Sequence, residues 1–263
     1  MSANAAVNAA PRRTLLPGPH APLGAHLRDG GVDVAVASQR AKRIELCVFS
    51  DDGQREIERL PLNAGEDGVF HGRLEGAGAG LVYGFRAHGR YQPESGYRFN
   101  PAKLLLDPYA RALVGDFQWR SEHHGWAASH PQGRQPDSRD NAALALKGRV
   151  ASDPQLLADG LAVRAASRPR RPLRDSVLYE LNVRGFTMQL PGIPEALRGT
   201  FEGLAHPASI AHLRSLGVTT LSLMPVMEWL AEAPLAERGL RNYWGYNTIA
   251  IFCPARRLCH QPN

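Results

Sequence analysis

Short runs of alternating apolar and polar residues fill the chain between about residues 20 and 89. Turn-rich stretches, SDDGQ, NAGED and EGAGAG, separate these runs at a spacing of roughly a dozen residues. Alternation with a period of two predicts strands that bury one face, and regular turns predict an antiparallel arrangement. The pattern therefore predicts a small antiparallel β-sandwich over residues 21–110. Its clearest strands are expected at Val32–Ser38, Arg43–Phe49, Gly68–Glu75 and Leu81–Gly89.

The segments on either side of this region lack such periodicity. Residues 1–20 are rich in Ala, Pro and Gly, which predicts a disordered lead. Residues 111–173 hold only short apolar pieces between turn residues, so we expect an irregular connector there. The glycines of EGAGAG precede no helix, which argues against a phosphate-binding loop and favours a hairpin turn.

The hydrophobic pattern changes at Asp175. The near-continuous apolar run Val177–Val183 predicts a strand that is covered on both faces. Residues 207–217, PASIAHLRSLG, have apolar residues at helical spacing, a proline at the start and a glycine at the end. Val218–Val226 predicts the next strand. A strand, a helix and a second strand form a βαβ unit, which requires a parallel sheet.

Three stretches closely resemble bacterial glycogen debranching enzymes of the isoamylase type, within the α-amylase superfamily. They are YRFNPAKLLLDPYAR, YELNVRGFTMQLPGIPEALRGTFEGLAHPASIAHLRSLGVTTLSLMPV and NYWGYNTIAIFCP. The sandwich strands resemble the carbohydrate-binding module that precedes the barrel in that family, so the resemblance covers roughly Pro17–Arg257. A maltooligosyltrehalose trehalohydrolase shares the YEL, LGV and MP landmarks. NPAKLLLDPYAR and the insert LPGIPEALRGTFEGLAHP favour the debranching enzymes.

The resemblance implies that residues 174–263 begin a (β/α)8 TIM barrel, whose active site lies at the C-terminal ends of its strands. It also implies hydrolysis of α-1,6 branch linkages in glycogen or limit dextrin by two carboxylic groups. In the family these groups follow later strands, and the 89 residues from Asp175 onward hold only two strands of a barrel that takes roughly 250. We therefore expect the catalytic carboxylates beyond residue 263, and no hydrolysis by the 263 residues alone.

The carboxylates that follow the connector offer no substitute pair. A glycosidase needs two carboxyl groups about 5 to 10 Å apart across the scissile bond, and none of those present lies in a matching family motif. We expect solvated surface positions for all of them, and the sequence assigns no catalytic residue. They are Asp175, Glu180, Glu195, Glu202, Glu228, Glu232 and Glu237.

One substrate contact is implied by the resemblance. In the family the tyrosine of a Gly-Tyr pair stacks on the sugar ring next to the scissile bond, and the matching residues are Gly245 and Tyr246. An aromatic face suits the apolar C–H side of a pyranose, and the hydroxyl can bond a rim group. The alternative is that these aromatic residues only pack a loop onto the barrel mouth. We favour stacking for Tyr246 and packing for Tyr243 and Trp244.

The irregular connector contains a second group of rings, Trp119 and Trp126 with His123 and His124. These side chains could bind glucan or close an interdomain seam, and we favour the seam. The two adjacent histidines lack the i, i+4 spacing of a metal site.

The three cysteines are odd in number and show no CxxC spacing. We accordingly expect no metal site, no disulfide framework and no cofactor.

Charge and composition change the picture little. The net charge is +6, but 28 arginines against 3 lysines, beside abundant Ala and Gly, is a bias that GC-rich coding also produces. The cluster Arg164–Arg174, RAASRPRRPLR, could contact phosphates, yet its prolines favour a solvated linker. We expect glycogen or a branched α-glucan as the partner, and no nucleic acid or membrane. With no signal-peptide or membrane-spanning run, a cytoplasmic location is the default, and the oligomeric state stays open.

The last residues, LCHQPN, depart from the family pattern, in which an aromatic residue and a barrel helix would follow Arg257. A frameshift or premature stop in the gene is our preferred explanation, and a genuine short protein is the alternative. Two barrel strands without neighbours would leave open sheet edges, so we expect the second domain to be poorly stable alone. Besides a truncated debranching hydrolase, a noncatalytic glucan-binding module or remnant remains an alternative function.

Overall fold

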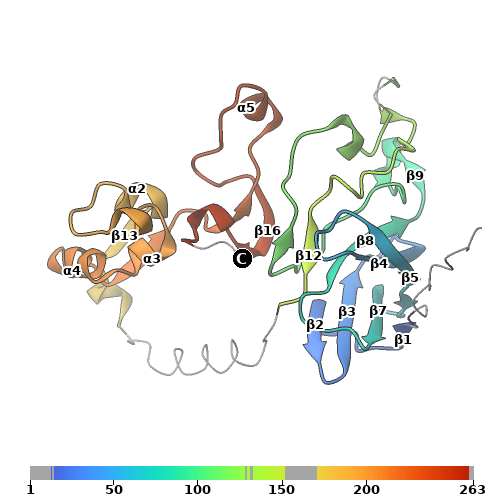
Figure 1. Cartoon of the computed structure of the whole chain (residues 1–263), viewed down its shortest axis with the longest axis horizontal. Coiled ribbons are helices and arrows are strands. Elements are labelled where there is room, and N and C mark those ends of the chain that lie inside the picture. The colour runs from blue at the N-terminus through green and yellow to red at the C-terminus, as the bar shows by residue number, and fades with distance from the viewer. Residues whose placement is uncertain (1–12, 14, 128, 131–132, 152–170, 261–263) are drawn as a thin grey trace, which may run out of the picture. The chain divides into compact units, whose positions relative to one another are not determined.

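The computed structural model describes residues 13, 15–127, 129–130, 133–151 and 171–260. The chain forms two compact units, Met1–Pro154 and Gln155–Asn263, whose elements are labelled in Figure 1. Of the lead predicted to be disordered, residues 1–12 and 14 lie outside the described residues. The predicted linker cluster of arginines also lies outside them up to residue 170, as do residues 261–263 of the tail.

The first unit is an antiparallel β-sandwich, as the hydrophobic pattern predicts. Its first sheet contains β1 (Leu15–Leu16), β2 (Gly24–Arg28), β3 (Gly31–Ala37), β6 (Asn63–Ala64) and β7 (Val69–Glu75). Its second sheet contains β4 (Arg43–Phe49), β5 (Glu56–Pro61), β8 (Val82–His88), β11 (Leu113–Val114) and β12 (Lys147–Arg149). The strand orders are β1-β7-β3-β2, with β6 beside β7, and β11-β12-β8-β4-β5. The four predicted strands correspond to β3, β4, β7 and β8.

Glycine-containing turns connect the neighbouring strands. Asp29 and Gly30 join β2 to β3, and Gly30 has a φ of +76°, which suits the tight turn of a two-residue hairpin. SDDGQ likewise turns the chain from β4 into β5. EGAGAG is not the predicted hairpin, because β7 and β8 belong to different sheets. It carries the chain from one layer of the sandwich to the other.

Both faces of the second sheet are covered, and this explains why β4 and β8 are buried almost throughout. The main core lies between the sheets and includes Val32, Leu46 and Leu74, which have no exposed surface. On the opposite face, Cys47 and Phe49 pack with Leu104 and residues from the segment that follows it. Burial raises the pKa of the Cys47 thiol to about 12, so this group behaves as a core residue.

The segment 111–173 contains sandwich structure that the sequence did not predict. β11 pairs with β12, and β12 pairs with β8 of the second sheet. These strands are two and three residues long, so they carry no detectable periodicity. A small hairpin of β9 (Tyr91–Gln92) and β10 (Tyr97–Arg98) precedes them. The described part of the predicted irregular connector therefore belongs largely to the first unit.

The second unit contains the predicted βαβ arrangement. β13 (Leu178–Leu181) pairs in parallel with β14 (Thr220–Leu223), and α4 (Pro207–Ser215) lies between them in sequence. β15 (Met227–Trp229) pairs antiparallel with β16 (Thr248–Pro254). The other α-helices among the described residues of this unit are α2 (Val183–Thr187), α3 (Phe201–Leu204) and α5 (Ala233–Glu237). A core of Leu181, Val183, Leu213, Trp229, Ala255 and Leu258 joins β13, α2, α4 and β15 to the residues that follow β16.

Local capping explains where the elements of the second unit end. Asn182 ends the first strand early, because its side chain accepts a hydrogen bond from the Gly185 amide at 2.9 Å and caps α2. Pro207 begins α4, and Gly217, with a φ of +74°, follows its end. The first strand is not covered on both faces as predicted, because the side chains of Val177 and Leu178 are exposed.

No helix in the described part of the chain is long and apolar enough to cross a membrane. Cys47, Cys253 and Cys259 are all free thiols.

Candidate functional site

The loop that carries Tyr246 runs from α5 to β16 and is organised by Asn242. The Asn242 Oδ1 accepts a hydrogen bond from the Gly245 amide at 2.8 Å, and its Nδ2 donates to Glu232 at 2.8 Å. Its backbone carbonyl accepts from the indole of Trp229 at 2.9 Å. Because Trp229 is buried in the core of the unit, these bonds tie the loop to a fixed element.

Gly245 has a backbone conformation that requires glycine. Its φ is +88°, and a Cβ at this position would lie 3.2 Å from Pro225. L-residues with side chains rarely adopt this conformation. The glycine of the Gly-Tyr pair therefore sets the direction of the chain at Tyr246, whose side chain is 70 % exposed.

Two further aromatic residues lie beside Tyr246 in sequence. Tyr243 and Trp244 pack edge to face, with ring centroids 5.3 Å apart, and each remains about half exposed. They are therefore packed against one another but not covered by the unit. The loop presents three aromatic side chains whose apolar faces and polar atoms match the amphipathic surface of a sugar.

Two arginines that follow β16, Arg256 and Arg257, contact residues at the base of this loop. The Arg257 guanidinium lies 4.2 Å from the centroid of the Trp229 ring and donates to the Asn242 carbonyl at 3.0 Å. Burial lowers the pKa of Arg257, and the negative charge of Glu228 opposes this effect. Arg256 forms an ion pair with Glu228 at 3.2 Å. These contacts hold the base of the loop without using any group of Tyr246.

The seven carboxylates considered from the sequence are all among the described residues of the second unit. Glu228 is buried, against the predicted surface position, because Arg256 neutralises it through its backbone amide and guanidinium. Glu232 is half-buried and bonds Asn242. The other five are exposed, namely Asp175, Glu180, Glu195, Glu202 and Glu237. We assign no catalytic role to any of these seven carboxylates.

One carboxyl group of the first unit has a pKa raised by burial, that of Asp107. This side chain is fully buried and accepts hydrogen bonds from the Tyr83 hydroxyl at 2.6 Å and the Tyr109 amide at 2.8 Å. Because it has no access to solvent, Asp107 acts as a structural group of the sandwich.

The rings between residues 117 and 126 form two small stacks. Phe117 contacts Trp119 and His123, at centroid distances of 5.1 and 4.7 Å, and His124 lies 4.6 Å from Trp126. Burial lowers the pKa of His123, so its ring is mainly neutral near pH 7. Within the described ranges no group of three His, Cys, Asp or Glu side chains is placed to hold a metal ion.

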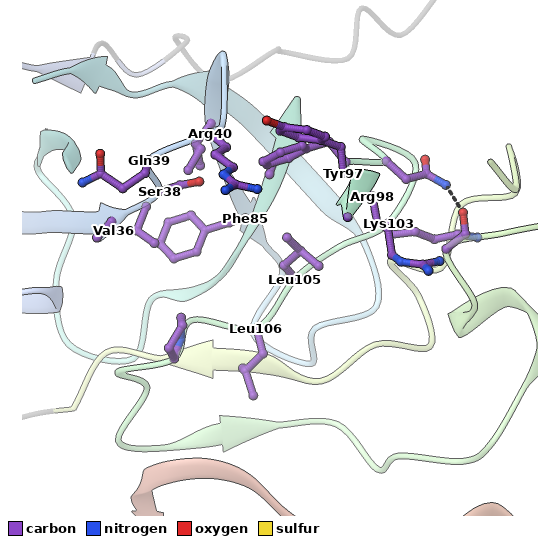
Figure 2. A pocket seen from close by; sticks show the side chains of 18 of the residues that line it. Val36, Ser38, Gln39, Arg40, Phe85, Tyr97, Arg98, Lys103, Leu105 and Leu106 are labelled. Atoms are coloured by element: carbon purple, nitrogen blue, oxygen red, sulfur yellow. Dashed lines mark hydrogen bonds between the residues drawn. The ribbon is translucent and has the colours of Figure 1, made fainter. Parts of the chain in front are cut away.

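A cleft of about 660 Å³ opens in the first unit between the β3–β4 connection and residues 96–108 (Figure 2). Lys103 supports one wall, because its ammonium donates to the carbonyls of Glu122 and Arg139 and lies 3.7 Å from Asp137. Burial lowers the pKa of Lys103, and the negative charge of Asp137 opposes that shift. No local sequence pattern indicates this cleft, because its lining comes from segments far apart in the chain.

Comparison with known proteins relates both units to α-glucan-degrading enzymes. Residues 22–110 match the family model of carbohydrate-binding module 48, described as the isoamylase N-terminal domain. Glycogen debranching enzymes from two strains of Klebsiella pneumoniae are 43% identical to 95% of the chain. The chain spans only 36% of the length of these relatives.

Solved structures show the same fold. The pullulanase from Bacillus acidopullulyticus has a TM-score of 0.63 and 19% identity, covering 92% of this chain and 26% of its own. A mutant pullulanase from Paenibacillus barengoltzii complexed with maltotetraose has a TM-score of 0.62 and 19% identity, with 90% and 32% covered. The expected resemblance and fold class are therefore confirmed: a sandwich of the module 48 type precedes βα segments that align with the pullulanases.

Proposed function

We propose that this chain is the N-terminal part of a cytoplasmic glycogen debranching hydrolase that cleaves α-1,6 branch linkages in glycogen or limit dextrin. The observation that carries the proposal is the 43% identity to glycogen debranching enzymes, which extends over 95% of the chain. The same identity favours debranching over the trehalohydrolase alternative. In this proposal the carboxylates that hydrolyse the bond lie in the part of the enzyme that these 263 residues do not span.

Within the enzyme, Tyr246 is the residue that we assign to the substrate. Its ring projects from a loop fixed by Asn242 and Gly245, and most of its surface is free to contact a ligand. Stacking the ring on a pyranose removes apolar surface of both partners from water, while the hydroxyl of the tyrosine stays at the edge. The sandwich would position the glucan or act as a spacer.

A noncatalytic glucan-binding role of these residues is the second candidate. It is favoured by the exposure of Tyr243, Trp244 and Tyr246 on one short loop, because exposed aromatic groups are a common means of binding sugars at a surface. The two candidates share the same contact and differ in whether hydrolysis follows.

Replacing Tyr246 tests the shared contact. In titrations of the 263-residue protein with maltohexaose, Tyr246→Ala is expected to weaken binding about tenfold, because aromatic stacking contributes about 0.5–1.5 kcal/mol beyond area burial. Tyr246→Phe keeps the ring and is expected to stay within about threefold of the parent protein. Ile251→Ala is the matched control, since Ile251 is a similarly exposed apolar side chain on β16. Equal affinities of Tyr246→Ala and Ile251→Ala for maltohexaose would show that Tyr246 does not contact the substrate.

A further inference from the structure

The floor of the cleft in the first unit is apolar. Ile44 and Phe85 belong to the core between the sheets, and Phe99 packs against that core. Leu105 and Leu106 complete the apolar lining, and Leu105 is 46% exposed. Figure 2 shows Phe85 and Leu105 beside the same space. A cavity of about 660 Å³ with such a floor lies within the usual range of small-molecule sites, about 300–1,000 Å³.

The edge of the cleft carries positive charge. The guanidinium of Arg40 lies 5.1 Å from the centroid of the Tyr97 ring, which holds it beside the opening. Arg98 also lines the cleft and is exposed. No Asp or Glu is among the lining residues, and across the described ranges neither arginine forms an ion pair. Lys103 does not add to this free charge, because Asp137 neutralises it.

We propose that this cleft binds a small amphipathic carboxylate, with its apolar body on the Phe85 floor and its carboxylate at the edge, where Arg40 and Arg98 supply positive charge. A guanidinium binds a carboxylate through charge-assisted, often bidentate, hydrogen bonds. Because no acidic side chain lines the cleft, none competes with a ligand for these exposed guanidiniums. This site is separate from the Tyr246 loop and does not depend on the proposed debranching role.

The apolar floor itself offers the hydroxyl groups of a glucan no partners, although the polar residues Ser38, Gln39 and Asn100 also line the cleft. A sugar brings several hydroxyl groups, and each one that is buried without a partner costs about 1–3 kcal/mol. The aliphatic and phenyl groups of Ile44, Phe85 and Leu105 offer no hydrogen bonds. The apolar chain of an acyl or aromatic carboxylate has no such requirement.

Three octyl ligands with different head groups distinguish binding of the apolar chain from binding of the carboxylate. Octanoate, 1-octanol and octylamine are titrated into the ¹⁵N-labelled 263-residue protein, and the amide shifts of Gly96 and Gly125, which line the cleft, report binding. Octanoate is expected to bind at least about tenfold more tightly than 1-octanol, because a charge-assisted hydrogen bond contributes about 1.5–3 kcal/mol. Octylamine is expected to bind more weakly than either.

Two double variants test whether the arginines at the edge of the cleft cause the preference for octanoate over 1-octanol. Arg40→Gln/Arg98→Gln is expected to lower the affinity for octanoate about tenfold and to leave that for 1-octanol unchanged. Arg55→Gln/Arg214→Gln removes the same charge from exposed positions outside the cleft and is expected to behave as the parent protein. Leu105→Asn, at an exposed position on the floor, is expected to weaken both ligands.

The proposal is overturned if octanoate and 1-octanol bind alike, or if the two double variants have equal affinity for octanoate. It is also overturned if octanoate shifts other amides but neither Gly96 nor Gly125. Displacement of octanoate by maltohexaose would overturn it as well, because the cleft would then be a glucan site. Loss of maltohexaose binding in Tyr246→Ala would not contradict the proposed carboxylate site, because Tyr246 belongs to the other unit.

Discussion

Arg86→Met is expected to destabilise the sandwich by about 2–3 kcal/mol. Arg86 is almost fully buried, and its guanidinium bonds Glu56 and Asp140 at 2.8 Å each and the Pro101 carbonyl at 2.9 Å. Burial alone would lower the pKa of Arg86, but the bonds to the two carboxylates outweigh this and raise it. Removing one partner of a buried ion pair costs about 3–5 kcal/mol. We lower that figure because Asp140 is 56% exposed.

Urea unfolding of the sandwich measures this loss. Trp119 and Trp126 report the first unit in a Trp229→Phe/Trp244→Phe background. Arg59→Met is the matched control, because Arg59 bonds the same Glu56 from an exposed position. That surface pair is expected to contribute less than about 1 kcal/mol. Equal losses in the two variants would show that burial of Arg86 does not determine its contribution.

The pH dependence distinguishes charge from packing. Burial is the largest single influence on the pKa of Asp140 and tends to raise it, but the bond and charge of Arg86 and the hydrogen bond from the Ala142 amide together hold the pKa below its usual value. The associated stabilisation is complete above the unfolded pKa of an aspartate, about 3.9, and is lost as the pH falls through the lower folded value. The difference between Arg86→Met and the parent protein is therefore expected to shrink as the solution is acidified below about pH 4. A difference that stays constant would indicate a packing effect alone.

Lys147→Met is expected to stabilise the same unit by about 1–3 kcal/mol at pH 7. Lys147 is 1% exposed. Burial lowers its pKa from 10.5 to about 8, although the charges of Asp140 and Asp52 oppose the shift. That difference corresponds to about 3 kcal/mol. The variant also loses the contact with the Phe49 ring, at 5.1 Å, which contributes about 0.5–2 kcal/mol.

The gain from Lys147→Met has a defined pH window. Below about pH 8 the lysine is charged in both states, so the folded protein bears the full cost of burying the charge. Between about 8 and 10.5 the unfolded chain binds a proton that the folded chain has released, and the stability of the parent protein rises with pH. The advantage of the variant is therefore expected to fall towards zero or below by about pH 10.5. Lys42→Met, at an exposed position, is expected to change nothing, and an advantage independent of pH would contradict the account.

The same two buried cations show where the hydrophobic pattern of the sequence fails. β5 was not predicted, because its polarity is inverted: Ile57 is exposed, whereas Glu56 is turned inward to meet Arg86. β12 was missed because it is short and begins with Lys147, a residue that is rarely buried. Alternation reveals strands with apolar inner faces, as in β3 and β7, but not strands whose inner face carries a charged residue.

The candidate site was accessible from the sequence through motifs rather than periodicity. The Gly-Tyr pair located Tyr246, and the structure explains the glycine by its positive φ and its approach to Pro225. The exposure of Tyr243 and Trp244 was not predicted, because sequence alone does not show what covers a loop. The cleft beside Tyr97 depends on side chains from the β3–β4 connection, β8 and the β10 region, and no local pattern records that combination.

Activity of a hybrid enzyme tests the central claim most directly. In it, these residues replace the matched N-terminal 36% of the Klebsiella pneumoniae glycogen debranching enzyme, and the release of reducing ends from a branched limit dextrin is measured. We expect the hybrid to hydrolyse the dextrin and the 263-residue protein alone to release nothing, because hydrolysis requires a pair of carboxyl groups that our proposal places outside these residues. A folded but inactive hybrid, or hydrolysis by the 263-residue protein itself, would contradict the account.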